Sequence, residues 1–275
     1  MKIAVAQMKC VLGDVPANCR TLASLVERAG GHGCDVIVFP EICDTGYEMS
    51  VIREQASAWP GLPFDTAQSA AAKHGVHVIC GLSEREGQSI YNSAAVFSPK
   101  GDLLAKYRKA HLFTPSPVNE DRCFTAGSSL EVVNIGGLKW GLMICYDLRF
   151  PELARALAVQ GAEVLALCTA WPFPRVAHLQ TLVQARAIEN QTYVVSANRV
   201  GTDGPVTFCG SSCIIDPYGV IVASAAVDRE ELLIGEINRE TLVWVRGRMP
   251  VFAGRRADLY GDLKAGAPVD RNEAS

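Results

Sequence analysis

Short apolar runs alternate with longer amphipathic stretches along the whole chain. Apolar runs of about four to eight residues bounded by turn residues are typical of buried strands. They predict strands at residues 2–6, 35–40, 76–82, 138–145, 164–168 and 192–198. Amphipathic stretches with Pro near the start or Gly after the end are typical of helices. They predict helices at residues 16–29, 64–74, 151–160 and 177–190.

Hairpins interrupt this alternation at two places. The predicted strands at 90–98 and 103–108 flank the turn SPKGD, and those at 208–215 and 220–224 are joined by DPYG. Hairpins combined with strand–helix–strand units favour mixed sheets covered by helices over a purely parallel, doubly wound sheet.

The last part of the chain gives a weaker pattern. A strand is predicted at 232–237, and the Arg-rich tail after Glu240 is expected to be irregular. No Pro-, Ser- or Gly-rich linker and no change of composition divides the sequence. We therefore expect residues 1–275 to form a single domain.

Charge and composition exclude several classes of protein. The chain has 26 Lys and Arg against 29 Asp and Glu, a formal net charge of −3, so it has no overall electrostatic attraction for nucleic acid or an anionic membrane. No apolar stretch approaches the roughly 18 residues of a membrane span, and no signal-peptide core follows the first residues. Ten cysteines in 275 residues are too few for a disulfide scaffold. We expect a soluble cytoplasmic protein with reduced thiols.

The sequence gives no indication of a metal or cofactor. Cys209 and Cys213 form the closest cysteine pair, but no histidine lies near them and no second pair complements them, so packing is the simpler interpretation. The glycine-rich dinucleotide fingerprint, the phosphate-binding loop and the G-x-S-x-G nucleophile motif are all missing from the sequence. We therefore expect neither a metal site nor a cofactor.

Three chemically reactive side chains follow predicted strands. Glu41 comes directly after DVIVFP, Lys109 ends the strand before His111, and Cys145 closes the strand LKWGLMIC. In α/β folds, functional groups tend to lie just beyond the carboxyl ends of strands. Each residue alone is more often a loop acid, a surface amine or a core thiol. Their combination, a carboxylate, an amine and a thiol, predicts a nucleophilic site.

The strings FPEICDTGY, YRKAHLF and ICYDLRFPEL resemble the three signature blocks of the nitrilase superfamily, the carbon–nitrogen hydrolases, and their order and intervals fit as well. The similarity extends from Ile3 to about Tyr260, and the chain resembles the amidase branch. The resemblance implies an α/β fold of the α+β type, a four-layer α-β-β-α sandwich with two mixed β-sheets. It also implies a homodimer or higher oligomer, with the tail at about 241–275 crossing to a partner subunit.

The resemblance assigns a role to each reactive group. Cys145 corresponds to the nucleophile and Glu41 to the general base, while Lys109 and the backbone N–H of Tyr146 would stabilise an oxyanion. Glu120 matches a further residue that binds the catalytic lysine in many relatives.

Other polar residues near these blocks have simpler interpretations. His111 is a possible alternative base in a papain-like Cys–His pair, but we expect it to be structural because the blocks align on the glutamate. Asp147, Arg149 and Glu152 are expected to form local ion pairs that fix the turn after Cys145. Arg186 and Glu189 are expected to pair along a helix.

The substrate is predicted less sharply than the reaction class. The superfamily hydrolyses amides, nitriles and N-carbamoyl compounds; we favour a small amide as substrate, with water as co-substrate. The segment TAWPFPRVAH resembles the substrate loop of short amidases that act on ω-amides of 2-oxo acids. Arg175 is then a candidate partner for a substrate carboxylate, and Trp171 and Tyr47 are candidate pocket walls, although all three could be ordinary loop or core residues. A non-enzymatic scaffold is the remaining alternative.

Overall fold

The computed structural model describes residues 1–260 of the chain. Its first sheet contains six strands in this part of the chain, in the order β14-β1-β2-β3-β4-β5. The pairs β1–β2 and β2–β3 are parallel and the others antiparallel, so the sheet is mixed. The strands are β1 (Lys2–Gln7), β2 (Val36–Val38), β3 (His77–Glu86), β4 (Ser89–Phe97), β5 (Leu103–Arg108) and β14 (Glu231–Glu236).

The second sheet has the same construction. Within residues 1–260 it contains six strands in the order β13-β12-β9-β8-β7-β6, with parallel pairing among β7, β8 and β9 and antiparallel pairing elsewhere. The strands are β6 (Val132–Ile135), β7 (Leu138–Ile144), β8 (Val164–Thr169), β9 (Tyr193–Asn198), β12 (Cys213–Ile215) and β13 (Ile221–Ser224). A separate hairpin is formed by β10 (Val200–Asp203) and β11 (Val206–Cys209).

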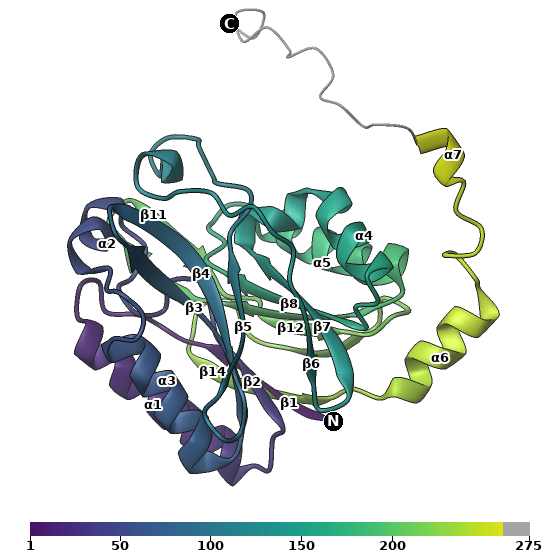
Figure 1. The fold of residues 1–275 in the computed structure, drawn as a ribbon, viewed down its shortest axis with the longest axis horizontal. Helices are drawn as coiled ribbons and strands as arrows, with labels where there is room; N and C mark the ends of the chain where they lie inside the picture. The colour runs from purple at the N-terminus through teal and green to yellow at the C-terminus, as the bar shows by residue number, and fades with distance from the viewer. Residues whose placement is uncertain (261–275) are drawn as a thin grey trace, which may run out of the picture.

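The two sheets pack face to face between two layers of helices. Figure 1 shows α1 (Val15–Gly31) and α3 (Leu62–His74) on the outside of the first sheet, and α4 (Pro151–Val159) and α5 (Val176–Asn190) on the outside of the second. One continuous apolar cluster joins the facing sides of both sheets, for example Val5 and Val38 with Leu142 and Val195. The predicted four-layer α-β-β-α sandwich with two mixed sheets is therefore confirmed.

Most predicted elements are present with ends shifted by a few residues, but one predicted strand is broken. Residues 208–215 are divided between β11 and β12, because Gly210 and Ser211 adopt positive φ angles of 47° and 58°. A Cβ on Gly210 would lie 2.6 Å from the Ala226 carbonyl oxygen, so the chain turns at a place where only glycine fits. Cys209 and Cys213 consequently lie on separate strands, both buried.

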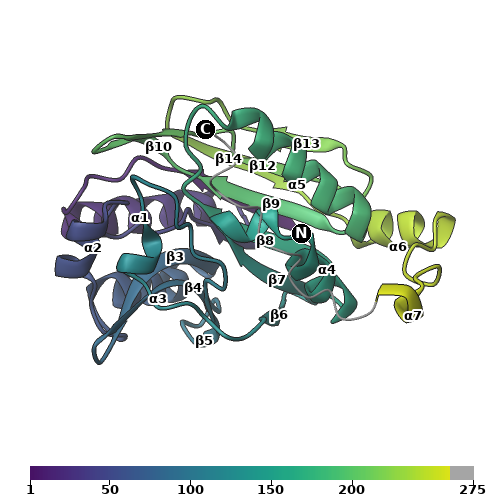
Figure 2. The same cartoon turned by 90° about the horizontal axis from the view of Figure 1, so that it is seen from above.

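The expectation of an irregular tail after Glu240 is wrong for the described residues. Helix α6 (Arg239–Arg248) begins where the Asn238 side chain accepts a hydrogen bond from the Glu240 N–H, and it buries Leu242 and Val245 on one face. A short α7 (Ala257–Tyr260) follows, and both helices extend beyond the sandwich (Figure 2). The tail expected to cross to a partner continues into 261–275, outside the described residues. No helix among residues 1–260 is long and apolar enough to span a membrane.

Candidate active site

The ends of three strands bring the predicted catalytic residues together from both sheets. Glu41 lies in the turn that follows β2, and Lys109 follows β5, so both come from the first sheet. Cys145 follows β7 of the second sheet and opens a short 3₁₀ helix, η2 (Cys145–Arg149). The face-to-face packing of the sheets therefore places a carboxylate and an ammonium opposite a thiol.

The local backbone is specialised at two of these positions. Cys145 has φ 42°, a left-handed conformation that non-glycine residues rarely adopt and that is common at functional sites. Near Glu41, a Cβ added to Gly81 of β3 would lie 2.6 Å from the Glu41 Cα and from the Pro40 carbonyl oxygen. Glycine at position 81 therefore lets β3 approach the turn that carries Glu41.

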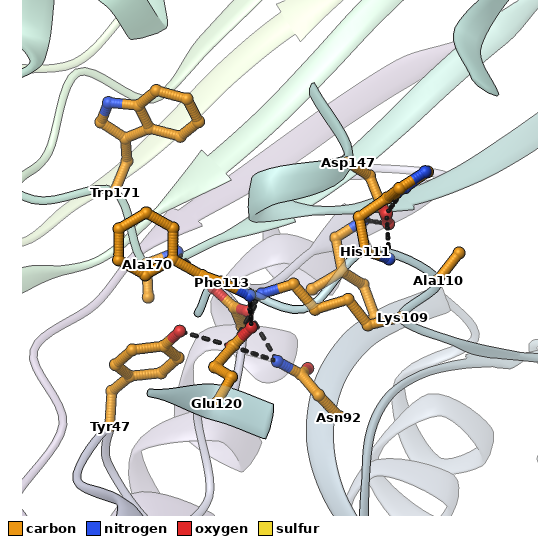
Figure 3. A network of polar contacts seen from close by, with 12 residues as sticks. Tyr47, Asn92, Lys109, Ala110, His111, Phe113, Glu120, Asp147, Ala170 and Trp171 are labelled. Atoms are coloured by element: carbon orange, nitrogen blue, oxygen red, sulfur yellow. Dashed lines mark hydrogen bonds and ion pairs between the residues drawn. The ribbon is translucent and has the colours of Figure 1, made fainter. Parts of the chain in front are cut away.

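Lys109 is the centre of a buried polar network. Its Nζ lies 2.7 Å from Glu41 Oε1 and 2.8 Å from Glu120 Oε1, and all three side chains are fully buried. Figure 3 shows Glu120, Asn92 and Tyr47 gathered near the Lys109 ammonium. An ammonium has three donors, and the third N–H of Lys109 has no acceptor among residues 1–260.

The two carboxylates differ in how fully they are hydrogen-bonded. Glu120 accepts from Lys109 Nζ, Tyr47 Oη and Asn92 Nδ2 on one oxygen, and from the Phe113 N–H at 2.6 Å on the other. Glu41 accepts from Lys109 and Asn92 on Oε1, whereas within residues 1–260 its Oε2 accepts a single hydrogen bond, from the Ala170 N–H at 2.9 Å. A carboxylate oxygen has two acceptor sites, so Oε2 of Glu41 retains one free acceptor site within the described residues, as does Oε2 of Glu120.

Burial and charge set the protonation of this network. Complete burial raises the pKa of Glu41, an effect that the Lys109 ammonium opposes and the Glu120 carboxylate reinforces. Burial alone would lower the pKa of Lys109, but the two carboxylates outweigh it and raise that pKa. Two carboxylates share one ammonium, so Glu41 is predisposed to accept a proton.

The Cys145 thiol lies within the electrostatic range of both partners. Burial raises its pKa, and the Glu41 carboxylate raises it further, whereas the Lys109 ammonium lowers it. The thiol is therefore protonated at neutral pH and needs an acceptor for its proton before it can act as a nucleophile.

A narrow pocket that is partly open to solvent leads to the thiol. The sequence-predicted residues Tyr47, Tyr146, Trp171 and Arg175 all line it beside Cys145. Its other lining residues are Phe113, Val118, Arg149, Ala170, Pro172 and Val206. The pocket thus combines apolar walls with two guanidinium groups.

Arg149 does not make the local ion pair that we expected. Its guanidinium lies 4.7 Å from the centre of the Trp171 ring and 3.3 Å from His178 Nδ1, at the pocket. Asp147 is taken instead by Tyr107 Oη and by the backbone N–H groups of His111 and Ile144. The turn after Cys145 is thus held by one local hydrogen bond, from the Ile144 N–H, and by two from residues far away in the sequence, in place of the expected local ion pairs.

His111 lies beside the network rather than in it. Its Nδ1 is 2.7 Å from Asp147 Oδ1, and its ring stacks on Phe150 with 3.7 Å between ring centres. This arrangement matches the structural part expected for His111. The expected Arg186–Glu189 pair is present at 3.0 Å.

Comparison with known families gives a direct match. The family model described as carbon-nitrogen hydrolase matches residues 2–246. The chain belongs to this family. The hydrolase is 35% identical over 260 residues to the 2-oxoglutaramate amidase of Bacillus subtilis, covering 94% of this chain and 98% of that protein. It is 34% identical over 246 residues to the omega-amidase NIT2 of Danio rerio, covering 86% and 88% of the two chains.

Solved structures of an amidase from Nesterenkonia sp. AN1 share the fold of the hydrolase. One superposes with a TM-score of 0.85 at 27% identity, covering 96% of this chain and 97% of that one. That amidase carries the acetamide moiety of fluoroacetamide, added covalently at its active site cysteine. The family prediction and the class of cysteine-dependent carbon–nitrogen hydrolase are therefore confirmed.

Three site residues of the hydrolase escaped the sequence analysis. Asn92 lies inside β4, in a strand of ordinary appearance, and Arg149 was assigned to a local ion pair. Asp203 accepts the Tyr47 N–H at 2.7 Å and pairs with the buried Arg199. An amide inside an apolar strand is the one local signal that could have identified Asn92. Among residues 1–260, no group of three or more His, Cys, Asp or Glu side chains could hold a metal ion.

Proposed function

We propose that the hydrolase is an amidase that releases ammonia from the ω-amide of a small carboxylate-bearing substrate of the 2-oxoglutaramate type. One observation supports a substrate that bears a carboxylate. Arg149 and Arg175 both line the pocket of Cys145, and neither takes part in an ion pair within residues 1–260. A planar guanidinium binds a carboxylate with two parallel hydrogen bonds, so this pocket favours an anionic substrate. The names of the two relatives, a 2-oxoglutaramate amidase and an omega-amidase, agree with such a substrate.

In the proposed mechanism Cys145 is the nucleophile and Glu41 the general base. As the Sγ–carbon bond forms, the thiol proton passes to Glu41 Oε2, and the free N–H of Lys109 and the Tyr146 N–H stabilise the oxyanion. The oxyanion then collapses, the carbon–nitrogen bond breaks, and Glu41 delivers its proton to the departing ammonia.

A thioester at Cys145 remains after ammonia leaves. Glu41 next takes a proton from water, whose oxygen attacks the thioester carbon. Breakdown of this second oxyanion releases the carboxylic acid, and the proton returns to sulfur. Glu120 has the supporting role of holding Lys109 in place.

A substrate panel tests this function. Ammonia release is measured for 2-oxoglutaramate and for valeramide, an amide of similar length without a carboxylate, with the Cys145→Ala variant as the blank. We expect kcat/KM for 2-oxoglutaramate to be at least about 100-fold higher, since charge-assisted hydrogen bonds contribute on the order of 1.5–3 kcal/mol each. Arg175→Ala should raise KM for 2-oxoglutaramate about tenfold or more and leave valeramide unchanged.

The panel also separates the alternative reactions. N-carbamoyl amino acids would release CO2 as well as ammonia, and an aliphatic nitrile would yield the acid from a substrate without an amide. Faster turnover of either class, or equal rates for 2-oxoglutaramate and valeramide, would contradict the proposal.

We also propose that the hydrolase is a single domain that forms homodimers through its α4–α5 face, with the chain after Glu240 lying across the partner. Support comes from the exposed apolar residues Val159 and Ile188 on these helices and from the projection of α6 and α7 (Figure 1). Light scattering should give the mass of a dimer for the wild type and of a monomer for Val159→Glu. A cytoplasmic location is proposed with it, supported by ten unpaired cysteines.

A further inference from the structure

Asn92 contacts both carboxylates of the buried network through one amide nitrogen. Its Nδ2 lies 2.6 Å from Glu41 Oε1 and 3.4 Å from Glu120 Oε1, while the residue is only 1% exposed. Both contacts are donations to acceptor-only groups, so the amide is oriented with its nitrogen toward the carboxylates. Figure 3 shows this side chain beside Glu120 and near Lys109.

The other end of the same amide is left without a partner. Asn92 Oδ1 is buried and accepts no hydrogen bond within residues 1–260. A buried unpaired carbonyl is unfavourable, and an apolar residue at this place in β4 would avoid it. The benefit of an amide at this position therefore lies in the hydrogen bonds that its nitrogen donates to Glu41 and Glu120.

The backbone of Asn92 holds the third member of the network. The Lys109 N–H donates to the Asn92 carbonyl oxygen at 2.8 Å, continuing the β4–β5 ladder past the end of β5. One residue therefore fixes the main chain of the ammonium and the side chain of the proposed base. Because Asn92 does not line the pocket of Cys145, it has no direct contact with a bound substrate.

We infer that Asn92 is a positioning residue of the reaction, which holds Glu41 by its Oε1 so that Oε2 stays directed to the Cys145 thiol and keeps its free acceptor site. This inference rests on the proposed role of Glu41 as the base. It separates the two oxygens of Glu41 by function: Oε1 is bound by Lys109 and Asn92, and Oε2 exchanges the proton.

The inference predicts a change in the pH profile. The Asn92 hydrogen bond stabilises the ionised form of Glu41 and lowers its pKa against the larger effect of burial. The other titratable groups that face Glu41 are Lys109, Glu120, Tyr47, Cys145 and Cys168. None of them changes in an Asn92 variant, so loss of the amide should raise the pKa of Glu41 and move the acid limb of kcat/KM to higher pH.

The deciding experiment compares Asn92→Ala with Ser93→Ala. Ser93 is the next residue on β4, is equally buried, and donates to Glu84 at 2.7 Å without touching the network. For Asn92→Ala we expect kcat to fall about 10- to 100-fold, KM to change less than twofold, and the acid limb to shift upward by about half a pH unit or more. Ser93→Ala should keep the kinetics of the wild type.

Two outcomes would overturn the inference. One is an Asn92→Ala enzyme with the wild-type acid limb and kcat. The other is an equal loss of kcat in Ser93→Ala, which would indicate a merely structural role for this stretch of β4. If Asn92→Ala is recovered unfolded, the isosteric Asn92→Asp variant decides in its place: it removes the donor and adds a carboxylate, so kcat should fall further, and a wild-type profile would refute the inference.

Different results would refute the proposed function and this inference. A Cys145→Ala enzyme that still releases ammonia would refute the mechanism as a whole. An inactive Cys145→Ala enzyme together with a normal Asn92→Ala enzyme would refute only the positioning role.

Discussion

Two clusters of charged side chains lie on opposite faces of β4, and they shift the pKa of a glutamate in opposite directions. On the outer face, Glu84 of β3 is bound by Lys106 at 2.6 Å and Arg108 at 2.6 Å, both from β5. On the inner face, Glu41 shares the single ammonium of Lys109 with Glu120. Neighbouring residues of β4 serve the two sides, since Ser93 donates to Glu84 and Asn92 to Glu41.

The number of cations bound to each glutamate explains the difference: two bind Glu84, and one binds Glu41. Burial opposes ionisation of Glu84, but Arg108 and Lys106 outweigh it and lower its pKa. For Glu41, burial prevails over one shared ammonium and the pKa rises. Similar side chains therefore lower the pKa of a glutamate on one face and raise it on the other.

The largest expected effect comes from removing each carboxylate in turn. Glu41→Gln should reduce kcat/KM by about 10³-fold or more, because the amide cannot accept the thiol proton. It should leave the melting temperature unchanged or higher, since one ammonium then faces one carboxylate. Glu84→Gln should keep activity within about threefold and lower the free energy of unfolding. Steady-state kinetics and thermal melts of both variants measure these four quantities, and a stable, active Glu41→Gln enzyme would refute the contrast.

Adding a methyl group at Gly81 should reduce activity strongly, although less than the loss of the Glu41 carboxylate. Gly81→Ala places a Cβ of β3 against the Glu41 backbone at 2.6 Å, so the turn must move away from Lys109. A displacement of about 1 Å can cost about 10²-fold in rate, and we expect a loss of that order in kcat. Gly247→Ala in α6 is the control, because nothing lies within 4 Å of its added Cβ. Equal kinetics for the two variants would contradict this prediction.

Loss of the His111 imidazole should weaken the enzyme moderately. His111→Ala removes the stacking on Phe150 and the contact with Asp147, and we expect kcat to fall about tenfold because the turn after Cys145 loosens. Cys145→Ala should abolish turnover. If a folded His111→Ala enzyme were as inactive as Cys145→Ala, the role of general base would have to be assigned to His111 instead of Glu41.

The smallest expected effect is on stability at acid pH. The pKa of Glu84 is lowered in the folded state, so its stabilisation is complete above its ordinary pKa of about 4.5 and is lost as the pH falls through the lowered value. The difference in unfolding free energy between wild type and Glu84→Gln, about 1 kcal/mol for partly exposed cations, should shrink below about pH 4.5. For Glu41 the sign is reversed, because its raised pKa means that protonation favours the folded state. Urea melts at several pH values would measure both trends.

The sequence was sufficient to predict the three central residues of the site, but not the residues that contact their neighbours. Glu41, Lys109 and Cys145 could be selected because each follows an apolar strand within a recognisable block. Arg149 could not be placed, since its neighbours Asp147 and Glu152 offered nearer partners in the sequence. The fold directs Asp147 to Tyr107 instead, and such a contact across 40 residues has no local signal.

The fold shows the same division between local and distant causes. Helix α6 follows a local rule, an Asn cap with apolar residues three apart, which the high Arg content obscured. The break between β11 and β12 has a distant cause, the Ala226 carbonyl packed against Gly210. Periodicity alone could not have located it, because both halves are equally apolar.

The division of the site between the two sheets has a consequence for the integrity of the molecule. The proposed base Glu41 and the Lys109 ammonium belong to the first sheet and the Cys145 sulfur to the second, so neither sheet alone contains the proposed set of catalytic groups. Turnover therefore depends on the alignment of the two sheets. A shift of one sheet against the other, along the apolar cluster between them, would abolish activity even if each sheet stayed folded.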